Sequence, residues 1–211
     1  MRRGQFITIE GIDGAGKSSH LAATAQWLRE RGKTVIETRE PGGTALGEQL
    51  RTMILHDAMS PMTELLAVFT ARAEHVAHLI APALARGDWV VCDRFTDSTR
   101  AYQGGGRGMD AAVIEQLATL SHAHCNPDLT LVFDIDLAVA AARVQGRASA
   151  THPEDKFESE SHAFIHRVQA AYQAIVAAEP KRCVRIDGGQ SLDAVRSDVL
   201  VALAQRFERH V

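Results

Sequence analysis

The stretch Phe6–Ser19, Phe-Ile-Thr-Ile-Glu-Gly-Ile-Asp-Gly-Ala-Gly-Lys-Ser-Ser, decides the fold, because an apolar run typical of a strand leads directly into a glycine-rich turn and a helix. Gly11, Gly16, Lys17 and Ser18 occupy the four fixed positions of the pattern G-x-x-x-x-G-K-[ST]. The glycines let backbone N–H groups approach phosphate oxygens closely, and the positive end of the following helix faces the same oxygens. The stretch therefore predicts a phosphate-binding loop for a nucleoside triphosphate.

Each position of this loop has a chemical task. Lys17 would reach the β- and γ-phosphates, and Ser18 would hold a Mg²⁺ cofactor. The predicted triphosphate-binding residues are Gly11, Ile12, Asp13, Gly14, Ala15, Gly16, Lys17 and Ser18.

Length and composition favour a single domain over residues 1–211, with 45% hydrophobic residues available for a core. The formal net charge of −3 gives no overall basic field, so we expect neither a nucleic-acid nor a membrane partner. The three cysteines are too few and too scattered for a disulfide framework. Arg2 and Arg3 precede the first strand without room for a signal peptide, and these signals together predict a cytoplasmic location.

Strand and helix signals alternate along the rest of the chain. Four further short apolar runs predict strands: Thr34–Thr38, Trp89–Cys92, Leu129–Phe133 and Val184–Ile186. Helical periodicity fills the intervals, with Pro61 marking a helix start and Pro82 a kink. The segment from Phe95 to Gly108 contains the run 103–108, which is too rich in glycine for a helix, and the segment is interpreted as a loop that needs close approach or mobility. The pattern predicts an α/β fold of three layers, the P-loop NTPase fold, with a five-stranded parallel sheet flanked by helices.

The end of the third predicted strand narrows the activity. Asp93 offers a carboxylate for Mg²⁺ or for an acceptor, and Arg94 offers a guanidinium able to fork onto a second phosphate. Two phosphate sites imply phosphoryl transfer to a phosphorylated acceptor. A GTP-dependent switch would need a guanine-reading Asn-Lys-x-Asp after a late strand, whereas this chain has only Asn126-Pro127-Asp128 there.

A series of motifs in a fixed order makes the chain resemble the bacterial thymidylate kinase family over nearly its whole length. The matching pieces are residues 10–18, Thr38-Arg39-Glu40-Pro41-Gly42-Gly43, Asp93-Arg94-Phe95, residues 101–108, residues 127–131 and Asp155-Lys156-Phe157-Glu158. The resemblance implies transfer of the γ-phosphoryl group of ATP to dTMP on a nucleoside-monophosphate-kinase fold, in a protein that is usually a homodimer.

The resemblance also implies roles for single residues. Asp13 matches the loop carboxylate near the acceptor sugar and the transferring phosphate, and Arg94 matches the ligand of the dTMP phosphate. The remaining positions matched to the dTMP site are Arg39, Phe69, Arg72, Thr99, Tyr102 and Gln103. Arg72 and Gln103 resemble the groups that read the thymine edge, and Tyr102 resembles the ring that favours deoxyribose. Many relatives place a stacking aromatic where this chain has Val68, so Phe69 is the candidate in its place.

The catalytic positive charge is expected from a lid at about residues 143–161. Some members of the family carry an arginine in the phosphate loop, whereas Gly14 and Ala15 here carry no charge. The resemblance therefore points to the lid, with Arg143, Arg147 and Lys156 as candidates. The full predicted catalytic set is Asp13, Lys17, Arg94, Arg143 and Arg147.

Two alternatives stay open from the sequence. The nearer one is another nucleoside or deoxynucleoside (mono)phosphate kinase of the same fold, because base choice is a property of the pocket. The more distant one is a non-catalytic ATP-binding switch module whose phosphate loop drives partner exchange.

Overall fold

The central layer of the protein is a twisted sheet of five parallel strands in the order β2-β3-β1-β4-β5. The strands are β1 (Phe6–Gly11), β2 (Val35–Arg39), β3 (Trp89–Asp93), β4 (Leu129–Asp134) and β5 (Cys183–Asp187). The structure is a computed structural model and describes residues 3–122, 124–146 and 156–208. The predicted five-stranded parallel sheet is confirmed, with the strand that precedes the phosphate loop at its centre.

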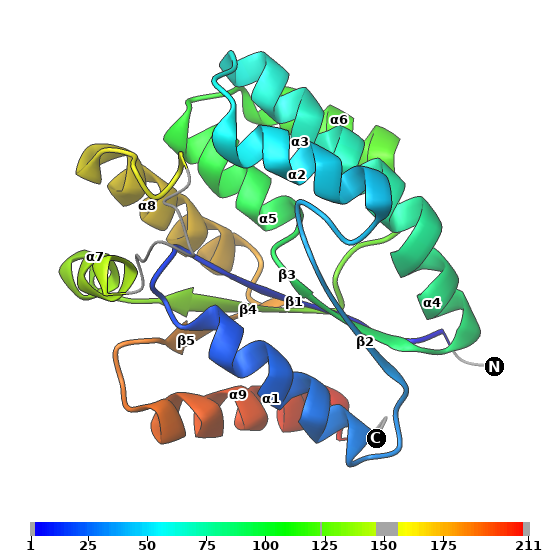
Figure 1. The fold of residues 1–211 in the computed structure, drawn as a ribbon. Helices are drawn as coiled ribbons and strands as arrows, with labels where there is room; N and C mark the ends of the chain where they lie inside the picture. The colour runs from blue at the N-terminus through cyan, green and yellow to red at the C-terminus, as the bar shows by residue number, and fades with distance from the viewer. Residues whose placement is uncertain (1–2, 123, 147–155, 209–211) are drawn as a thin grey trace.

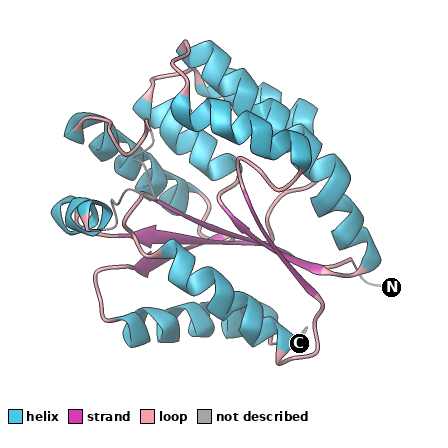
Figure 2. Ribbon diagram, viewed as in Figure 1, coloured by secondary structure: helices cyan, strands magenta, loops and turns pink. Residues whose placement is uncertain are grey.

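Helices cover both faces of the sheet and give three layers (Figure 1, Figure 2). Helices α1 (Lys17–Arg29) and α9 (Leu192–Phe207) lie together on one face. The other helical elements are α2 (Ala45–His56), α3 (Pro61–His75), η1 (Val76–Ile80), α4 (Ala81–Arg86), α5 (Thr96–Thr99), η2 (Arg100–Gly106), α6 (Ala111–His122), α7 (Leu137–Gln145) and α8 (His162–Ala178). Most of these cover the opposite face, while α7 lies beside the end of the sheet where β1 and β4 finish (Figure 1).

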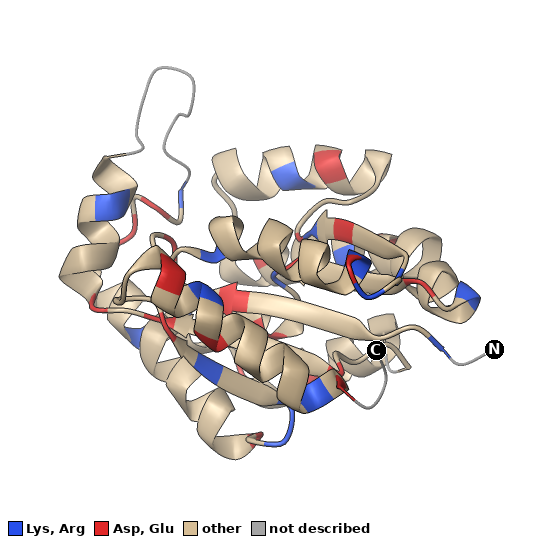
Figure 3. Cartoon of the chain, turned by 90° about the horizontal axis from the view of Figure 1, so that it is seen from below, with Lys and Arg blue, Asp and Glu red and all other residues tan. Residues whose placement is uncertain are grey.

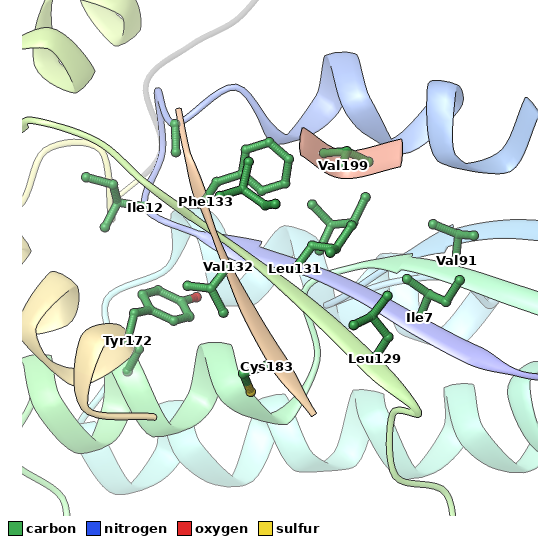
Figure 4. Close-up of a cluster of buried hydrophobic side chains, with 14 of the residues drawn as sticks. Ile7, Ile12, Val91, Leu129, Leu131, Val132, Phe133, Tyr172, Cys183 and Val199 are labelled. Atoms are coloured by element: carbon green, nitrogen blue, oxygen red, sulfur yellow. The ribbon is translucent and has the colours of Figure 1, made fainter. Parts of the chain in front are cut away.

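The core forms where the apolar strands meet the helices. Every residue of β1 and of β4 is buried, and Ile7 pairs with Val91 on one side and with Leu129 on the other. Figure 4 shows Leu131 and Phe133 of β4 near Val199 of α9. Continuous apolar runs of this kind are typical of strands covered by helices on both faces.

Local signals set the helix starts. Ser60 accepts a hydrogen bond from the backbone N–H of Thr63 and is followed by Pro61 at the first helical position, as the sequence predicted. Pro82, where the sequence predicts a kink, is the second residue of the short helix α4, and α4 directly follows the π-helical turn η1. A proline lacks the N–H for the helical ladder and crowds the preceding turn, and a wider turn accommodates it.

The prediction of a loop from Phe95 to Gly108 is wrong for most of that segment, since Thr96–Thr99 form helix α5. Residues 100–106 form the π-helix η2, which continues α5 and packs against α8. A Cβ at Gly105 would lie 2.7 Å from Cβ of Ala171, and one at Gly106 would lie 2.5 Å from a ring carbon of Phe164. The glycines therefore allow two helices to approach closely, and their number does not indicate a loop.

Charge is mixed over the surface. Figure 3 shows Lys and Arg interspersed with Asp and Glu along the elements visible in that view.

Among the described residues, no helix is both long enough and apolar enough to cross a membrane.

Candidate active site

The phosphate-binding loop joins β1 to α1 at the carboxyl edge of the sheet. Gly14 and Gly16 adopt φ values of 82° and 96°, a region that residues with a Cβ rarely occupy. A Cβ at Gly14 would also overlap the carbonyl oxygen of Ala140 in α7. Helix α1 starts at Lys17 without a side-chain cap, which leaves its first N–H groups available to an anion.

Lys17 lies across the loop and is buried. Its Nζ donates hydrogen bonds to the carbonyl oxygens of Gly11, at 3.0 Å, and Ile12, at 2.9 Å, and lies 3.5 Å from Oδ1 of Asp13. Burial lowers the pKa of Lys17, and the nearby Arg94 lowers it further. The ammonium group is thus held beside the anion-binding backbone.

A cleft of about 380 Å³ opens next to the loop. Its lining includes Asp13 and Ser18 from the loop side together with Arg39, Glu40, Arg51, Val68, Arg72, Asp93, Arg94, Thr99, Tyr102, Gln103 and Phe157. The strands contribute at their carboxyl ends, where ligands of open parallel sheets bind.

Arg94 stands between the loop and the cleft in an unusual backbone conformation, with φ of 70°. Its Nη2 donates to Oδ1 of Asp13 at 2.6 Å, and its Nη1 donates to the carbonyl oxygen of Gly11 at 3.0 Å and to Ser98 at 3.2 Å. Burial tends to raise the pKa of Asp13, but the Arg94 and Lys17 cations outweigh it and hold that pKa well below its usual range. A left-handed non-glycine residue costs backbone energy, and such strain is concentrated at functional sites.

A buried carboxylate supports Arg94 from behind. Glu10 accepts hydrogen bonds from the Phe95 backbone N–H at 2.7 Å, from the Ser98 hydroxyl at 2.6 Å and from the Tyr172 hydroxyl at 2.8 Å. Burial, and then the nearby Asp97 charge, raise the pKa of Glu10 to about 7. Glu10 is therefore a positioning group for the segment that carries Arg94.

Arg72 is held just as firmly and is only 1% exposed. Its Nε donates to Oε2 of Glu40 at 2.7 Å, its Nη1 to Oγ1 of Thr99 at 3.0 Å and its Nη2 to the carbonyl oxygen of Phe95 at 3.1 Å. Glu40 also contacts His75, with an Nδ1–Oε1 distance of 3.0 Å. Each terminal nitrogen of Arg72 carries a second N–H, so the guanidinium can still donate into the cleft.

Gln103 and Tyr102 come from η2. Nε2 of Gln103 donates to Oε1 of Glu64 at 2.9 Å, and the hydroxyl of Tyr102 donates to Oδ2 of Asp13 at 3.3 Å. Burial raises the pKa of Tyr102, which keeps its hydroxyl protonated. Both side chains line the cleft.

Asp93 and Ser18 provide oxygen atoms suited to a divalent cation. Both line the cleft, and Oδ1 of Asp93 is buried without a hydrogen-bond partner among the described residues. A carboxylate and a hydroxyl are ligand types that Mg²⁺ accepts, and Mg²⁺ commonly takes its other ligands from water and phosphate. These two residues fit the metal expected from the sequence.

The remaining predicted residues lie in different places. Arg39 lines the cleft and pairs with Glu48 at 2.9 Å. Phe69 is not part of the cleft lining and packs between α3 and α6, because the helix turns Val68 toward the cleft in its place. Arg143 donates to the carbonyl oxygens of Gly14, at 3.3 Å, and Gly188, at 3.0 Å.

The region predicted as a lid, at about residues 143–161, is described only in part. Arg147 and the stretch 148–155 lie outside the described residues, so their predicted role is untested. Lys156 is described, and its Nζ pairs with Oε2 of Glu64 at 3.0 Å. This pairing places Lys156 on the same carboxylate that accepts from Gln103.

Three acidic residues that hold the cleft together, Glu10, Glu40 and Glu64, were not predicted from the sequence. Glu10 carried a usable signal, because an acid inside the apolar strand β1 must find buried partners. Glu40 lay in a motif whose arginine alone was assigned. Glu64 follows a helix start, where acidic residues are common on solvent-exposed faces, and nothing in the sequence distinguishes it from those.

A phosphate-binding loop, a three-layer fold and an arginine-lined cleft at the carboxyl edge of a parallel sheet define a P-loop NTPase of the kinase type. The model of the thymidylate kinase family matches residues 9–199. The chain therefore belongs to the thymidylate kinase family.

Individual relatives agree with this family assignment. A thymidylate kinase of Methylobacillus flagellatus is 50% identical over 94% of this chain and 96% of the relative. One of Cupriavidus pinatubonensis is 53% identical over 93% of this chain and 96% of the relative. The crystal structure of a thymidylate kinase from Ehrlichia chaffeensis superposes with a TM-score of 0.77 at 33% identity, covering 95% of this chain and 98% of that one.

Proposed function

We propose that this protein transfers the γ-phosphoryl group of ATP to dTMP, giving dTDP and ADP. One observation carries the proposal. Lys17, on the side of the ATP phosphates, and Arg94, on the side of the dTMP phosphate, both approach the same carboxylate oxygen of Asp13. Oδ1 of Asp13 lies 2.6 Å from Nη2 of Arg94 and 3.5 Å from Nζ of Lys17. Two cations fixed this close together suit two phosphates that must approach each other in line.

On the donor side, residues 11–18 hold the ATP phosphates through backbone N–H groups, and Lys17 neutralises the β- and γ-oxygens. Arg94 holds the dTMP phosphate, and Asp13 keeps its guanidinium in place until that phosphate arrives. Negative charge spreads over the transferring group in the transition state, and these fixed cations stabilise it without reorganising.

Ser18 and Asp93 would hold the Mg²⁺ ion. When bound, the ion neutralises charge on the β- and γ-phosphates. The unpartnered Oδ1 of Asp93, among the residues that the structure describes, supports this assignment.

The base end of the cleft suits thymine. An N–H of Arg72 can donate to the 4-oxygen, and the carbonyl oxygen of Gln103 can accept from the ring N3–H. Thr99 supports this role by fixing Arg72, and Tyr102 would crowd a 2′-hydroxyl. Arg39 is proposed for the dTMP site at the outer edge of the cleft.

Arg143 and Arg147 are proposed to supply the positive charge from a lid at about residues 143–161 that closes over a single domain. The contact of Arg143 with the Gly14 carbonyl supports this, because it places one guanidinium beside the phosphate loop.

The family match and the arginines of the cleft favour this activity over the two alternatives left open by the sequence. A kinase for cytosine or adenine would gain nothing from the donor and acceptor pair of Arg72 and Gln103, because those bases carry an amino group and a ring-nitrogen acceptor at that edge. A switch module would not need a second phosphate site at Arg94.

The test is a panel of acceptors with ATP and Mg²⁺, in which ADP release is measured with dTMP, AMP, CMP, GMP and thymidine. We expect dTMP to stimulate release far above the others, and chelation of Mg²⁺ to abolish it. Equal turnover of thymidine would refute the second phosphate site, and equal turnover of AMP or CMP would refute the assignment of the base.

We also propose a cytoplasmic homodimer. Large apolar side chains are exposed along α2, α3 and α6, among them Leu46 (45% exposed), Leu66 (47%) and Leu120 (83%), and these three helices lie side by side in Figure 1. An apolar face of this kind is typical of a contact with a second copy. The unpaired thiols of Cys92, Cys125 and Cys183 support a reducing compartment. Sedimentation of wild-type protein and of Leu120→Glu tests the oligomeric state.

A further inference from the structure

A buried ion cluster lies at the Gln103 end of the cleft, and the residue at its centre has no role in the proposed function. Its centre is Glu64 of α3, which is 2% exposed. Oε1 of Glu64 accepts from Nε2 of Gln103 at 2.9 Å and from Nε of Arg107 at 3.2 Å. Oε2 accepts from Nη2 of Arg107 at 3.2 Å and lies 3.0 Å from Nζ of Lys156. Arg107 also donates to Glu160.

We propose that Glu64 is a specificity-determining residue, because it fixes which end of the Gln103 amide faces the base. This inference rests on the proposed function and goes one step beyond it. An ionised carboxylate can only accept hydrogen bonds, so it must take the NH₂ group of Gln103. The carbonyl oxygen of Gln103 is then left for the cleft, where it can accept from a base that carries N3–H.

The charge state of Glu64 agrees with this role. Burial alone would raise its pKa, but hydrogen bonds from Arg107, Gln103 and Lys156 outweigh burial and lower the pKa below its usual value. Glu64 is therefore an acceptor across the physiological pH range. Thymine and uracil carry N3–H, whereas the N3 of cytosine is an acceptor and would meet the Gln103 carbonyl without a proton between them.

The contacts of the two carboxylate oxygens predict what Glu64→Gln does. The oxygen Oε2 faces two cationic donors, on Arg107 and Lys156, which cannot become acceptors. The oxygen Oε1 faces only one such donor, Nε of Arg107, beside the amide of Gln103, which can rotate. The carbonyl of the new amide is therefore expected to stay there, and its NH₂ group to point at Gln103. Gln103 can relieve this clash by rotating its own amide, which turns its NH₂ group toward the base.

The probe must differ from dTMP at N3 without adding a donor at position 4. The 5′-monophosphate of 5-methyl-2-pyrimidinone deoxyriboside meets this need, because its N3 is an acceptor and it has only a hydrogen at position 4. The loss of the Arg72 contact is then common to all variants. The readout is the ratio of kcat/KM for this nucleotide to kcat/KM for dTMP.

We expect Glu64→Gln to raise this ratio by at least about tenfold, the discrimination that one mispaired buried polar group provides. Glu160→Gln is the matched control, since it removes a carboxylate from the same cluster but leaves the bond between Glu64 and Gln103. Its ratio should stay within about twofold of wild type. An unchanged ratio in Glu64→Gln, or an equal rise in both variants, would overturn the inference.

Exchanging the two side chains gives a rescue. In the double variant Glu64→Gln with Gln103→Glu, the amide donates to the carboxylate and the base again meets an acceptor, so the ratio should return to the wild-type value. Where Glu64→Gln alone fails to fold, the exchange decides: a wild-type ratio supports the inference, and a raised ratio overturns it. Wild-type protein that does not prefer dTMP in the acceptor panel would refute the proposed function, which a failed exchange would not.

Discussion

The phosphate loop and the acceptor cleft meet at Asp13, yet they are built in different ways. The loop is one continuous stretch, residues 11–18, and it works through main-chain groups set by glycine torsion angles. The cleft takes its cations from separate elements, and two of them are held by acids distant in sequence, Arg72 by Glu40 and Arg94 by Asp13. A backbone site is thus encoded in one motif, whereas a side-chain site depends on buried partners that no short motif contains.

The largest effect expected separates the two regions. Lys17→Ala should lower kcat by about a thousandfold, because Lys17 is the donor-side cation nearest the transferring group. Binding of dTMP, measured by calorimetry, should stay within a few-fold of wild type, and the thermal midpoint should show that the fold is kept. A loss of dTMP affinity as large as the loss of kcat would contradict the view that the loop serves ATP and the cleft serves dTMP.

The second effect lies on the cleft side. Arg94→Ala should weaken dTMP binding by about a hundredfold while ATP binding changes little, as expected for loss of charge-assisted hydrogen bonds to a phosphate. Because Arg94 has φ of 70°, Arg94→Gly separates the side chain from the backbone strain. Arg29→Ala is the matched control. Arg29 is the last residue of α1, away from the phosphate loop, and forms an exposed ion pair with Glu37 of β2.

Equal losses in Arg94→Ala and Arg94→Gly would assign the effect to the guanidinium. Full retention of dTMP affinity in the glycine variant would instead show that Arg94 serves only the backbone path after β3.

The same difference between the loop and the cleft explains how much of the fold and of the site could be predicted from the sequence. The sheet, its parallel direction and the start of α3 were predictable because apolar periodicity and capping act within a few residues. Arg94 was predicted from its position at the end of a predicted strand, and Arg72 and Gln103 were predicted from the family resemblance; all three line the cleft. Phe69 was predicted there as a substitute for the aromatic that many relatives carry at the position of Val68, and Val68 lines the cleft instead.

The errors came from residues whose role is set by tertiary contacts. Gly105 and Gly106 are required by the neighbouring helix α8, and composition alone presents the same glycines as a loop. Glu64 has no partner within its own helix turn that would mark it, since Gln103, Arg107 and Lys156 come from distant positions. Burial of such an acid can be seen only once the fold is known.

The smallest expected effect concerns Glu10, the buried acid behind Arg94. It sharpens the comparison because it tests whether burying a carboxylate on the cleft side lowers the free energy of unfolding by a measurable amount. Burial, and then Asp97, raise the pKa of Glu10 to about 7, against 4.5 for an ordinary glutamate. The folded state then binds more protons than the unfolded state between these two values. Stability must fall as pH rises through this window, by about 2 kcal/mol from pH 5 to pH 7.

Glu10→Gln removes this titration while keeping the size of the side chain, so the difference in unfolding free energy between wild type and variant should change with pH. Urea unfolding at pH 5, 6 and 7 measures that difference, and titrations shared by both proteins cancel in it. We expect wild type to lose about 2 kcal/mol relative to Glu10→Gln over this interval. Glu37→Gln, at an exposed position on β2, is the control and should show no such trend. A difference that stays constant with pH would mean that the hydrogen bonds from Phe95, Ser98 and Tyr172 offset the burial of the charge, and that Glu10 is ionised at no cost throughout.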